Sequence, residues 1–252
     1  YIKLNFTKML NKLRLKFFNR RIIQLHYFNI YHKLFFKKKP KKLFDDGYIL
    51  LNEKFPLKEL DFLNRYLSYD NYDFVADGKK IDLVDLKKIY VILNNIGVIS
   101  IVKRYLGNRI YCYDNSIKTL GNLKSYNSSW QPHHDSKGRR IKIYIWLNQK
   151  NLNTHPLYYL KKTHKKILNW AKYEETRFPQ IDLGKFDKIY GEKGSIIIFD
   201  THGIHSHFKD STIPRSVIEL TFESYGIFNR LNNKNINVET SRLNLIELNT
   251  LI

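Results

Sequence analysis

The spacing of hydrophobic residues along the chain changes near residue 109. Upstream, apolar residues recur at helical intervals in "PLKELDFLNRYLS" and again in "DLVDLKKIYVILNNIGVISIVKRYLG". The first segment predicts a helix, and the second predicts one or two helices that end at Gly107. Downstream, short apolar segments follow one another at intervals of roughly ten residues, as in β-sandwiches and barrels. We therefore predict helices from about residue 56 to 106, followed by an all-β core from about 109 to 225.

Individual strands can be placed within this pattern. A first short strand, at residues 48–51, follows the Asp-Gly turn in "FDDGYILL" and precedes the helices. The segment "HKKILNWAKYEETRF" interrupts the later strands and is predicted to be helical. The later strands lie in "RIYCYDNSIKTL", "KSYNSSWQPHHD", "RIKIYIWLN", "PLYYL", "GSIIIFD", "HSHF" and "RSVIELTFESYG". These elements form one domain, residues 44–252, after a leader at residues 1–43.

The leader differs from the domain in its charge. Residues 1–44 contain thirteen Lys and Arg residues and no acid, and apolar residues of "KMLNKLRLKFFNRRIIQL" fall on roughly one helical face. A basic amphipathic helix suits an anionic membrane surface or a nucleic acid. An ordinary N-terminal helix that packs on the domain explains the same pattern. We treat residues 1–43 as a basic helical leader and leave both explanations open.

Composition excludes two classes of protein. Cys112 is the only cysteine, so a disulfide framework is excluded. No uncharged apolar run reaches the roughly 18 residues that a membrane-spanning helix needs. Hydrophobic residues make up 43% of the chain, which is enough for a substantial core. We expect a cytoplasmic protein, with peripheral membrane contact through the leader as an open alternative.

The triplet His133-His134-Asp135 is a candidate for metal binding. Residues i and i+2 of a strand point to the same face, so His133 and Asp135 project together and His134 points away. Two imidazoles and one carboxylate bind Fe(II) on one face and leave three positions open for a bidentate cosubstrate and O2. A polar strand end explains an isolated H-x-D equally well, so the assignment depends on a third ligand.

A third ligand follows a buried apolar strand. The segment "GSIIIFDTHGIHSHF" runs from the strand at 195–199 through a turn to His205, at the start of the next strand. His202 is the competing candidate, but it lies too close to the end of "IIIF" to begin that strand. Arg215 begins "RSVIELTF" ten residues after His205, and its guanidinium suits a bidentate grip on a carboxylate. The catalytic metal ligands predicted from the sequence are His133, Asp135 and His205.

Together these residues resemble the phytanoyl-CoA dioxygenase family of non-haem Fe(II)/2-oxoglutarate oxygenases. "FDDGYILL" is similar to the family's early D-G-Y strand, and "SSWQPHHDS" to its W-H-x-D segment, with Trp130 displaced upstream. "RRIKIYIWLN" is similar to the strand that follows the metal loop. "HPLYYLKKTHK" resembles G-P-L-x-x-x-P-G-S-H-K, and "GSIIIFDTHGIHSH" resembles G-x-x-x-x-F-D-x-x-x-x-H. The resemblance covers about residues 44–225.

The resemblance implies a double-stranded β-helix (a cupin-like jelly roll) with the helices packed on its larger sheet. It also implies an Fe(II)- and 2-oxoglutarate-dependent dioxygenase that uses O2 and releases succinate and CO2. Arg215 would hold the far carboxylate of 2-oxoglutarate, and Trp146 would line the cosubstrate site. Lys142 and Tyr144 alternate with isoleucines on the strand face of Trp146, so they are further cosubstrate-binding candidates. The carboxylate of Asp135, which related halogenases lack, implies hydroxylation or desaturation.

The sequence departs from the family pattern at two places. "KKTHK" replaces Pro-Gly-Ser before His164, so we expect a differently shaped loop there. His207 stands two residues after the distal histidine, where the family often has Ser, so we expect one hydrogen bond to the cosubstrate to differ.

Two other functions fit parts of the sequence. A non-catalytic basic jelly-roll module that binds an anionic membrane or nucleic acid would explain the leader, but it has no need of three convergent ligands. A cupin enzyme that works without 2-oxoglutarate would explain the ligands but not Arg215. We expect a small-molecule or lipid-like substrate and no nucleic acid partner. The expected substrate loops, 136–140 and roughly 150–190, are basic, which favours an anionic substrate, although a solubilising surface explains the same charges.

Overall fold

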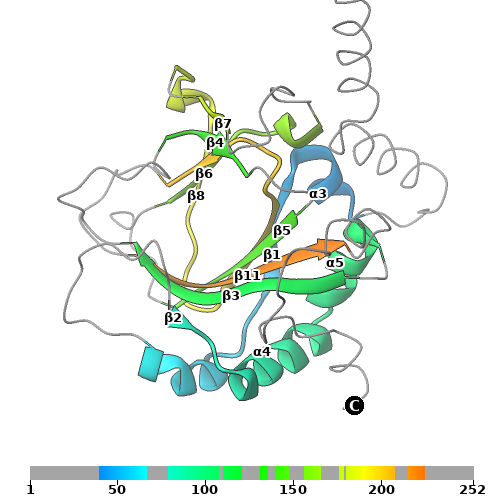
Figure 1. Cartoon of the computed structure of the whole chain (residues 1–252), viewed down its shortest axis with the longest axis vertical. Coiled ribbons are helices and arrows are strands. Elements are labelled where there is room, and N and C mark those ends of the chain that lie inside the picture. The colour runs from blue at the N-terminus through cyan, green and yellow to red at the C-terminus, as the bar shows by residue number, and fades with distance from the viewer. Residues whose placement is uncertain are drawn as a thin grey trace, which may run out of the picture.

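The structure is a computed structural model, and the residues that it describes form two β-sheets with helices outside the larger one (Figure 1). It describes residues 40–66, 79–107, 110–120, 131–135, 140–147, 156–165, 176–178, 180–207 and 215–224. Residues 1–39 of the predicted leader lie outside this set, as do Trp130 and residues 166–175 of the predicted helix.

The larger sheet has six strands in the order β1-β9-β5-β11-β3-β2, and all its pairs are antiparallel. Its strands are β1 (Tyr48–Lys54), β2 (Lys79–Lys80), β3 (Ile110–Leu120), β5 (Arg140–Trp146), β9 (Ser195–Asp200) and β11 (Arg215–Ser224). Every residue of β9 is buried, as its continuous apolar sequence predicts for a strand between two neighbours. β1 begins where we predicted but continues to Lys54.

The smaller sheet has five short strands in the order β7-β4-β10-β6-β8, also paired antiparallel. They are β4 (His133–His134), β6 (Leu157–Tyr159), β7 (Thr176–Arg177), β8 (Asp187–Ile189) and β10 (His205–Ser206). Two antiparallel sheets that face each other in this way form a double-stranded β-helix, which confirms the predicted fold. The helix predicted over residues 164–178 is wrong at its end, because Thr176 and Arg177 pair with β4.

The helices between residues 57 and 106 cover one face of the larger sheet, as predicted. The α-helices are α3 (Lys41–Asp46), α4 (Leu83–Asn95) and α5 (Val98–Leu106), and the 3-10 helices are η1 (Leu57–Tyr66), η3 (Thr163–Lys165) and η4 (Leu183–Lys185). α4 begins where the Asp82 carboxylate accepts a hydrogen bond from the backbone N–H of Asp85. Gly97 separates α4 from α5 in a left-handed conformation (φ 79°), and α5 ends at Gly107 as predicted.

Alternation along β5 divides the core into two parts. Ile141, Ile143 and Ile145 belong to the cluster that contains the buried residues of α4 and α5. Tyr144 and Trp146 belong to a second cluster, whose members come from both sheets. The even-numbered residues of β5 therefore face the smaller sheet, as the sequence alternation predicted.

Two further observations concern the helices. The boundary that we placed between leader and domain falls inside α3, and Leu43 is fully buried in the core. Among the described helices, none is by itself long and apolar enough to cross a membrane. α4 and α5 pass that criterion only as a pair, which is bent by 84°.

Candidate metal centre

His133, Asp135 and His205 come together because of strand register. β4 and β10 are antiparallel neighbours in which His133 is paired with His205, and the two ring centroids are 4.5 Å apart. Asp135 follows β4 directly, and its backbone N–H donates to the carbonyl of Thr201 in the turn before β10. The structure thus places on one side of the smaller sheet the three side chains that the sequence predicted as ligands.

The three side chains can hold one metal ion. Oδ1 of Asp135 lies 3.9 Å from Nε2 of His133 and 3.8 Å from Nε2 of His205. One ligand atom from each residue lies within 4.8 Å of the others. An ion with bonds of about 2.1 Å bridges ligand atoms up to about 4.2 Å apart, so small side-chain adjustments suffice.

Hydrogen bonds orient both imidazoles in the same way. Nδ1 of His133 lies 2.8 Å from the carbonyl oxygen of Gln131, and Nδ1 of His205 lies 2.9 Å from that of Gly203. These contacts assign the proton to Nδ1 and leave the Nε2 lone pair for a metal. Nε2 of His205 is buried and has no hydrogen-bond partner among the described residues. Such an orphaned buried acceptor fits a metal ligand.

Protonation states in the site also suit a metal. Burial, and then the neighbouring His133, lower the pKa of His205 to about 3, so this imidazole is neutral at physiological pH. Burial opposes ionisation of Asp135, but Lys142 first, and then His205 and His133, bring the pKa of this carboxyl well below its usual range. At neutral pH the site therefore offers a neutral imidazole at His205 and a carboxylate, as divalent metals require.

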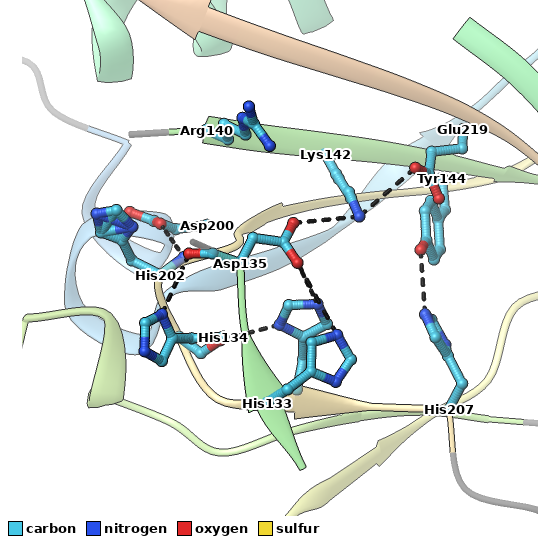
Figure 2. A network of polar contacts seen from close by, with 12 residues as sticks. His133, His134, Asp135, Arg140, Lys142, Tyr144, Asp200, His202, His207 and Glu219 are labelled. Atoms are coloured by element: carbon cyan, nitrogen blue, oxygen red, sulfur yellow. Dashed lines mark hydrogen bonds and ion pairs between the residues drawn. The ribbon is translucent and has the colours of Figure 1, made fainter. Parts of the chain in front are cut away.

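The two other histidines of these segments lie outside the triad. Nδ1 of His134 lies 3.1 Å from the Asp135 carbonyl oxygen, and its ring is tilted against Phe178 with centroids 5.9 Å apart. His202 lies in the turn before β10 and does not belong to the group that can hold a metal. Figure 2 shows both rings on the opposite side of Asp135 from the His133 ring.

A network around Asp200 shapes the turn that presents His205. One carboxylate oxygen of Asp200 accepts from Tyr105 Oη at 2.6 Å, and the other accepts from the backbone N–H of His202 at 2.8 Å. The Asp200 carbonyl accepts from Tyr159 Oη at 2.8 Å and from the Gly203 N–H at 3.0 Å. The Phe-Asp pair before the turn is visible in the sequence, but its partners Tyr105 and Tyr159 are not, because they come from α5 and β6.

Lys142 lies between two carboxylates. Its Nζ is 3.2 Å from Oδ2 of Asp135 and 3.5 Å from Oε1 of Glu219 (Figure 2). Glu219 also binds Lys118, with 2.8 Å between Nζ and Oε1. Burial disfavours the charged lysine, but Asp135 and Glu219 raise the pKa of Lys142 well above its ordinary value. The sequence analysis did not identify Glu219, although it lies on the strand face of Arg215 by the two-residue alternation of β11.

Arg215 is fully buried at the start of β11. Its Nη2 lies 2.8 Å from Nδ1 of His207, and its guanidinium carbon lies 5.7 Å from the centroid of the Tyr144 ring. Because a guanidinium only donates, Nδ1 of His207 is the acceptor, and Nε2 carries the proton and faces Tyr144 Oη at 3.3 Å. Burial lowers the pKa of Arg215 to about 10, so it stays charged at neutral pH.

Tyr144 and Trp146 lie on the predicted face of β5 and are both buried between the sheets. Burial, and then Glu219, raise the pKa of Tyr144 far above 10. Trp146 packs on Gly191, where a Cβ atom would overlap its ring. Both aromatic side chains can therefore form a rigid wall beside Arg215 and Lys142.

Basic residues from the expected substrate loops are engaged in ion pairs. Arg140 belongs to β5 and binds Glu223. Lys161 binds Asp187 at 2.9 Å, and the ammonium of Lys165 lies 3.4 Å from Asp45. Lys137, Arg139 and Lys166 lie outside the described residues.

Comparisons with known proteins give the fold but no family. No protein-family model matches the chain, and no curated protein matches its sequence. The structure is similar to SnoN, a non-heme alpha ketoglutarate dependent epimerase from nogalamycin biosynthesis, with a TM-score of 0.55 and 12% identity over 73% of this chain and 81% of SnoN. It is similar to EctD from S. alaskensis, with a TM-score of 0.50 and 15% identity over 75% of this chain and 79% of EctD.

The chain spans about half (49%) of a further similar structure, EvdMO1, at a TM-score of 0.49. SnoN has been solved with Fe3+ and alpha ketoglutarate, and EctD with Fe and with 2-oxoglutarate. Identities this low show a shared double-stranded β-helix and do not transfer an activity.

Proposed function

We propose that the protein is an Fe(II)- and 2-oxoglutarate-dependent dioxygenase that hydroxylates or desaturates a small-molecule or lipid-like substrate. The observation that carries the proposal is the triad itself. It consists of two similarly oriented imidazoles and an ionised carboxylate. Nε2 of His205 has no hydrogen-bond partner among the described residues. Two imidazoles and one carboxylate form the ligand set of the non-haem Fe(II) oxygenases.

Each residue has a defined task in this proposal. His133, Asp135 and His205 hold the metal, and the carbonyls of Gln131 and Gly203 keep both imidazoles turned toward it. Iron held by these residues would supply, with 2-oxoglutarate and O2, the oxidising power for attack on a C–H bond, and succinate and CO2 would be the products of 2-oxoglutarate. Arg215 binds the far carboxylate of 2-oxoglutarate through its planar fork.

The neighbouring side chains support a cosubstrate site beside the triad. His205 and His207 have ring centroids 6.3 Å apart, and His207 contacts Arg215, so the guanidinium lies close to the metal ligands. Tyr144 and Trp146 shield this region from water, which strengthens the interaction of a carboxylate with Arg215. Lys142 contacts Asp135 and Glu219, so we assign it to the support of the metal ligands and not to cosubstrate binding.

The structural neighbours support the same cofactors. SnoN and EctD share the fold of this chain, and both have been solved with iron and with 2-oxoglutarate or alpha ketoglutarate. We extend to this chain the cofactors but not the substrates. The retained Asp135 favours hydroxylation or desaturation. We further propose an anionic substrate, because the expected substrate loops, 136–140 and roughly 150–190, are basic. We also propose a cytoplasmic location, with peripheral membrane contact through the leader because of its positive charge.

Anaerobic titration tests the proposal. Fe(II) and 2-oxoglutarate added together to the full chain should give a weak visible charge-transfer band that neither gives alone, and His205→Ala should abolish it. Succinate formation in air should depend on both additions. Metal binding without the band would favour a cupin enzyme that works without 2-oxoglutarate. No metal binding at all would favour a non-catalytic binding module.

A further inference from the structure

The two carboxylate oxygens of Asp135 face different partners. Oδ1 faces the Nε2 atoms of His133 and His205, at 3.9 Å and 3.8 Å. Oδ2 faces the ammonium of Lys142 at 3.2 Å, from the neighbouring strand β5 (Figure 2). One oxygen of Asp135 thus faces the metal position, and the other faces the ammonium of Lys142.

Lys142 is itself held from both sides. Beyond Asp135, its Nζ lies 3.5 Å from Glu219, and Glu219 binds Lys118 at 2.8 Å. The charges alternate along the row Asp135, Lys142, Glu219 and Lys118, and the side chains of Lys142 and Glu219 are 16% and 3% exposed. A partly buried ammonium with two carboxylate neighbours stays charged and has few alternative positions.

The number of open positions on a metal held by a facial triad depends on whether its carboxylate binds through one oxygen or two. Chelation by 2-oxoglutarate takes two of the three open positions and O2 takes the third. A carboxylate that bound through both oxygens would occupy one of these positions. A carboxylate side chain can bind an ion through one oxygen or through both, and a partner that holds the second oxygen favours the one-oxygen mode.

We propose that Lys142 is a positioning residue that holds Oδ2 of Asp135 and so restricts this ligand to one oxygen. The role rests on the proposed function, since it concerns the same metal site. It differs from the role in cosubstrate binding that the sequence suggested for Lys142. It also makes Glu219 a support of the metal site, because Glu219 contacts Lys142 on the side away from Asp135.

The positioning role of Lys142 affects the affinity for the metal and the affinity for 2-oxoglutarate differently, whereas a structural defect would lower both. Loss of Lys142 removes a positive charge from beside a dication site, so the affinity for a divalent metal should hold or rise. Asp135 could then bind through both oxygens and compete with the chelating cosubstrate. Affinity of the metal-loaded protein for 2-oxoglutarate should therefore fall while the affinity for the metal does not.

Co(II) loading of the full chain gives a direct readout, because the visible spectrum of Co(II) reports its coordination. Wild type, Lys142→Met and Lys142→Arg would be titrated with Co(II) and then with 2-oxoglutarate under argon. We expect Lys142→Met to change the Co(II) spectrum and to weaken 2-oxoglutarate binding about tenfold, with Co(II) affinity unchanged or higher. Lys142→Arg, which keeps charge and donors, should stay within about threefold of wild type.

Lys118→Met is the matched control. It removes a lysine from the same row of charges but leaves the contact between Lys142 and Asp135 intact. Its Co(II) spectrum and 2-oxoglutarate affinity should match those of wild type. If Lys142→Met is unfolded by circular dichroism, Lys142→Gln replaces it in the same titrations.

The outcomes separate this role from the function on which it rests. An unchanged spectrum and an unchanged 2-oxoglutarate affinity in the neutral Lys142 variant would overturn the positioning role while leaving the oxygenase proposal intact. Parallel loss of both affinities in a folded variant would also overturn it. Wild-type protein that binds no Co(II) would overturn the proposed function and the positioning role together.

Discussion

Lys142, which is partly buried, and Arg215, which is fully buried, are cations on the same face of the larger sheet, and their surroundings give them different uses. Lys142 lies between the carboxylates of Asp135 and Glu219. Arg215 contacts the neutral imidazole of His207 and the face of the Tyr144 ring. An incoming carboxylate therefore gains more from the guanidinium than from an ammonium that already has two acidic neighbours.

Arg215→Ala should raise the apparent KM for 2-oxoglutarate at least about tenfold without weakening iron binding. Loss of one partner of a buried ion pair typically costs about 3–5 kcal/mol, which corresponds to more than two decades in affinity. Arg215→Lys should recover part of this, since an ammonium cannot reproduce the fork. Succinate formation against 2-oxoglutarate concentration measures the effect, and Arg104→Ala on α5 is the surface control. Identical curves for wild type and Arg215→Ala would make Arg215 a structural residue.

Cys112, the only thiol in the chain, allows a test of pH dependence. Burial, and then Asp114, raise the pKa of Cys112 to about 12. Native protein at pH 9 should therefore react with iodoacetamide far more slowly than protein in denaturant. The free energy of unfolding should therefore be unaffected by this thiol below about pH 9, the pKa of the thiol in the unfolded chain. It should fall as the pH rises from about 9 to about 12, because the thiol ionises first in the unfolded chain. Equal alkylation rates in the two states would contradict the burial of this residue.

Single turns and helix ends determine where the ligands lie. The turn before β10 is fixed by Asp200, whose carboxylate binds Tyr105 of α5 and the backbone of His202. The helical layer is thus hydrogen-bonded to the last residue of β9, directly before the turn that leads to His205. Packing of α5 is therefore part of the support of the metal site.

Two buried tyrosines of the helical layer test this link. Tyr105→Phe removes a hydrogen bond to a buried carboxylate and should lower the free energy of unfolding by about 1.5–3 kcal/mol. Tyr90 of α4 is similarly buried, but its hydroxyl has no hydrogen-bond partner among the described residues, so Tyr90→Phe should leave stability unchanged or raise it. Urea unfolding of the metal-free proteins compares them. Equal losses would mean that the hydroxyl of Tyr105 contributes nothing specific.

The loop before His164 shows how a departure from the family pattern is accommodated. Lys162 stands where the resembled motif has Gly, and it adopts a positive φ of 66°. Its N–H still donates to the carbonyl of Asp46, and Thr163 Oγ1 accepts from the N–H of Ile204. Lys162 is thus a strained residue in a well-bonded loop.

Lys162→Gly should accordingly stabilise the protein. A left-handed conformation costs a non-glycine residue about 1–2 kcal/mol, whereas glycine in the unfolded chain costs about 0.5–1 kcal/mol in entropy. We expect a net gain of roughly 0.5–1 kcal/mol, measured as a shift in the urea midpoint. Lys161→Gly, one residue earlier, loses an ion pair with Asp187 and gains no relief of φ, so it should destabilise. A loss of stability in both variants would argue against strain at Lys162.

For the molecule as a whole, the periodicity of the sequence predicted the strand faces and the ligand positions, but it did not predict contacts between distant elements. The two-residue alternation of β5 identified which of its side chains face the smaller sheet, and the spacing of His133, Asp135 and His205 identified the three convergent side chains. The contacts of Lys142 with Asp135 and of Tyr105 with Asp200 were missed, because they join elements that are adjacent only in the folded chain. Thr176 and Arg177 form a strand despite a helical sequence, because β4 provides a pairing edge.

Metal binding should stabilise the whole domain, because the ligands connect β4 to β10, the neighbours at the centre of the smaller sheet. A ligand that binds only the native state at about 100 times its Kd adds about 2.7 kcal/mol. For a chain of this length this corresponds to a rise in Tm of roughly 5–10 °C. Anaerobic thermal unfolding with and without Fe(II) measures the shift. His205→Ala should lose it, and His202→Ala, in the same turn but outside the triad, should keep it. The reverse pattern would show that His202 is the distal ligand, and equal shifts in both variants would place the metal elsewhere.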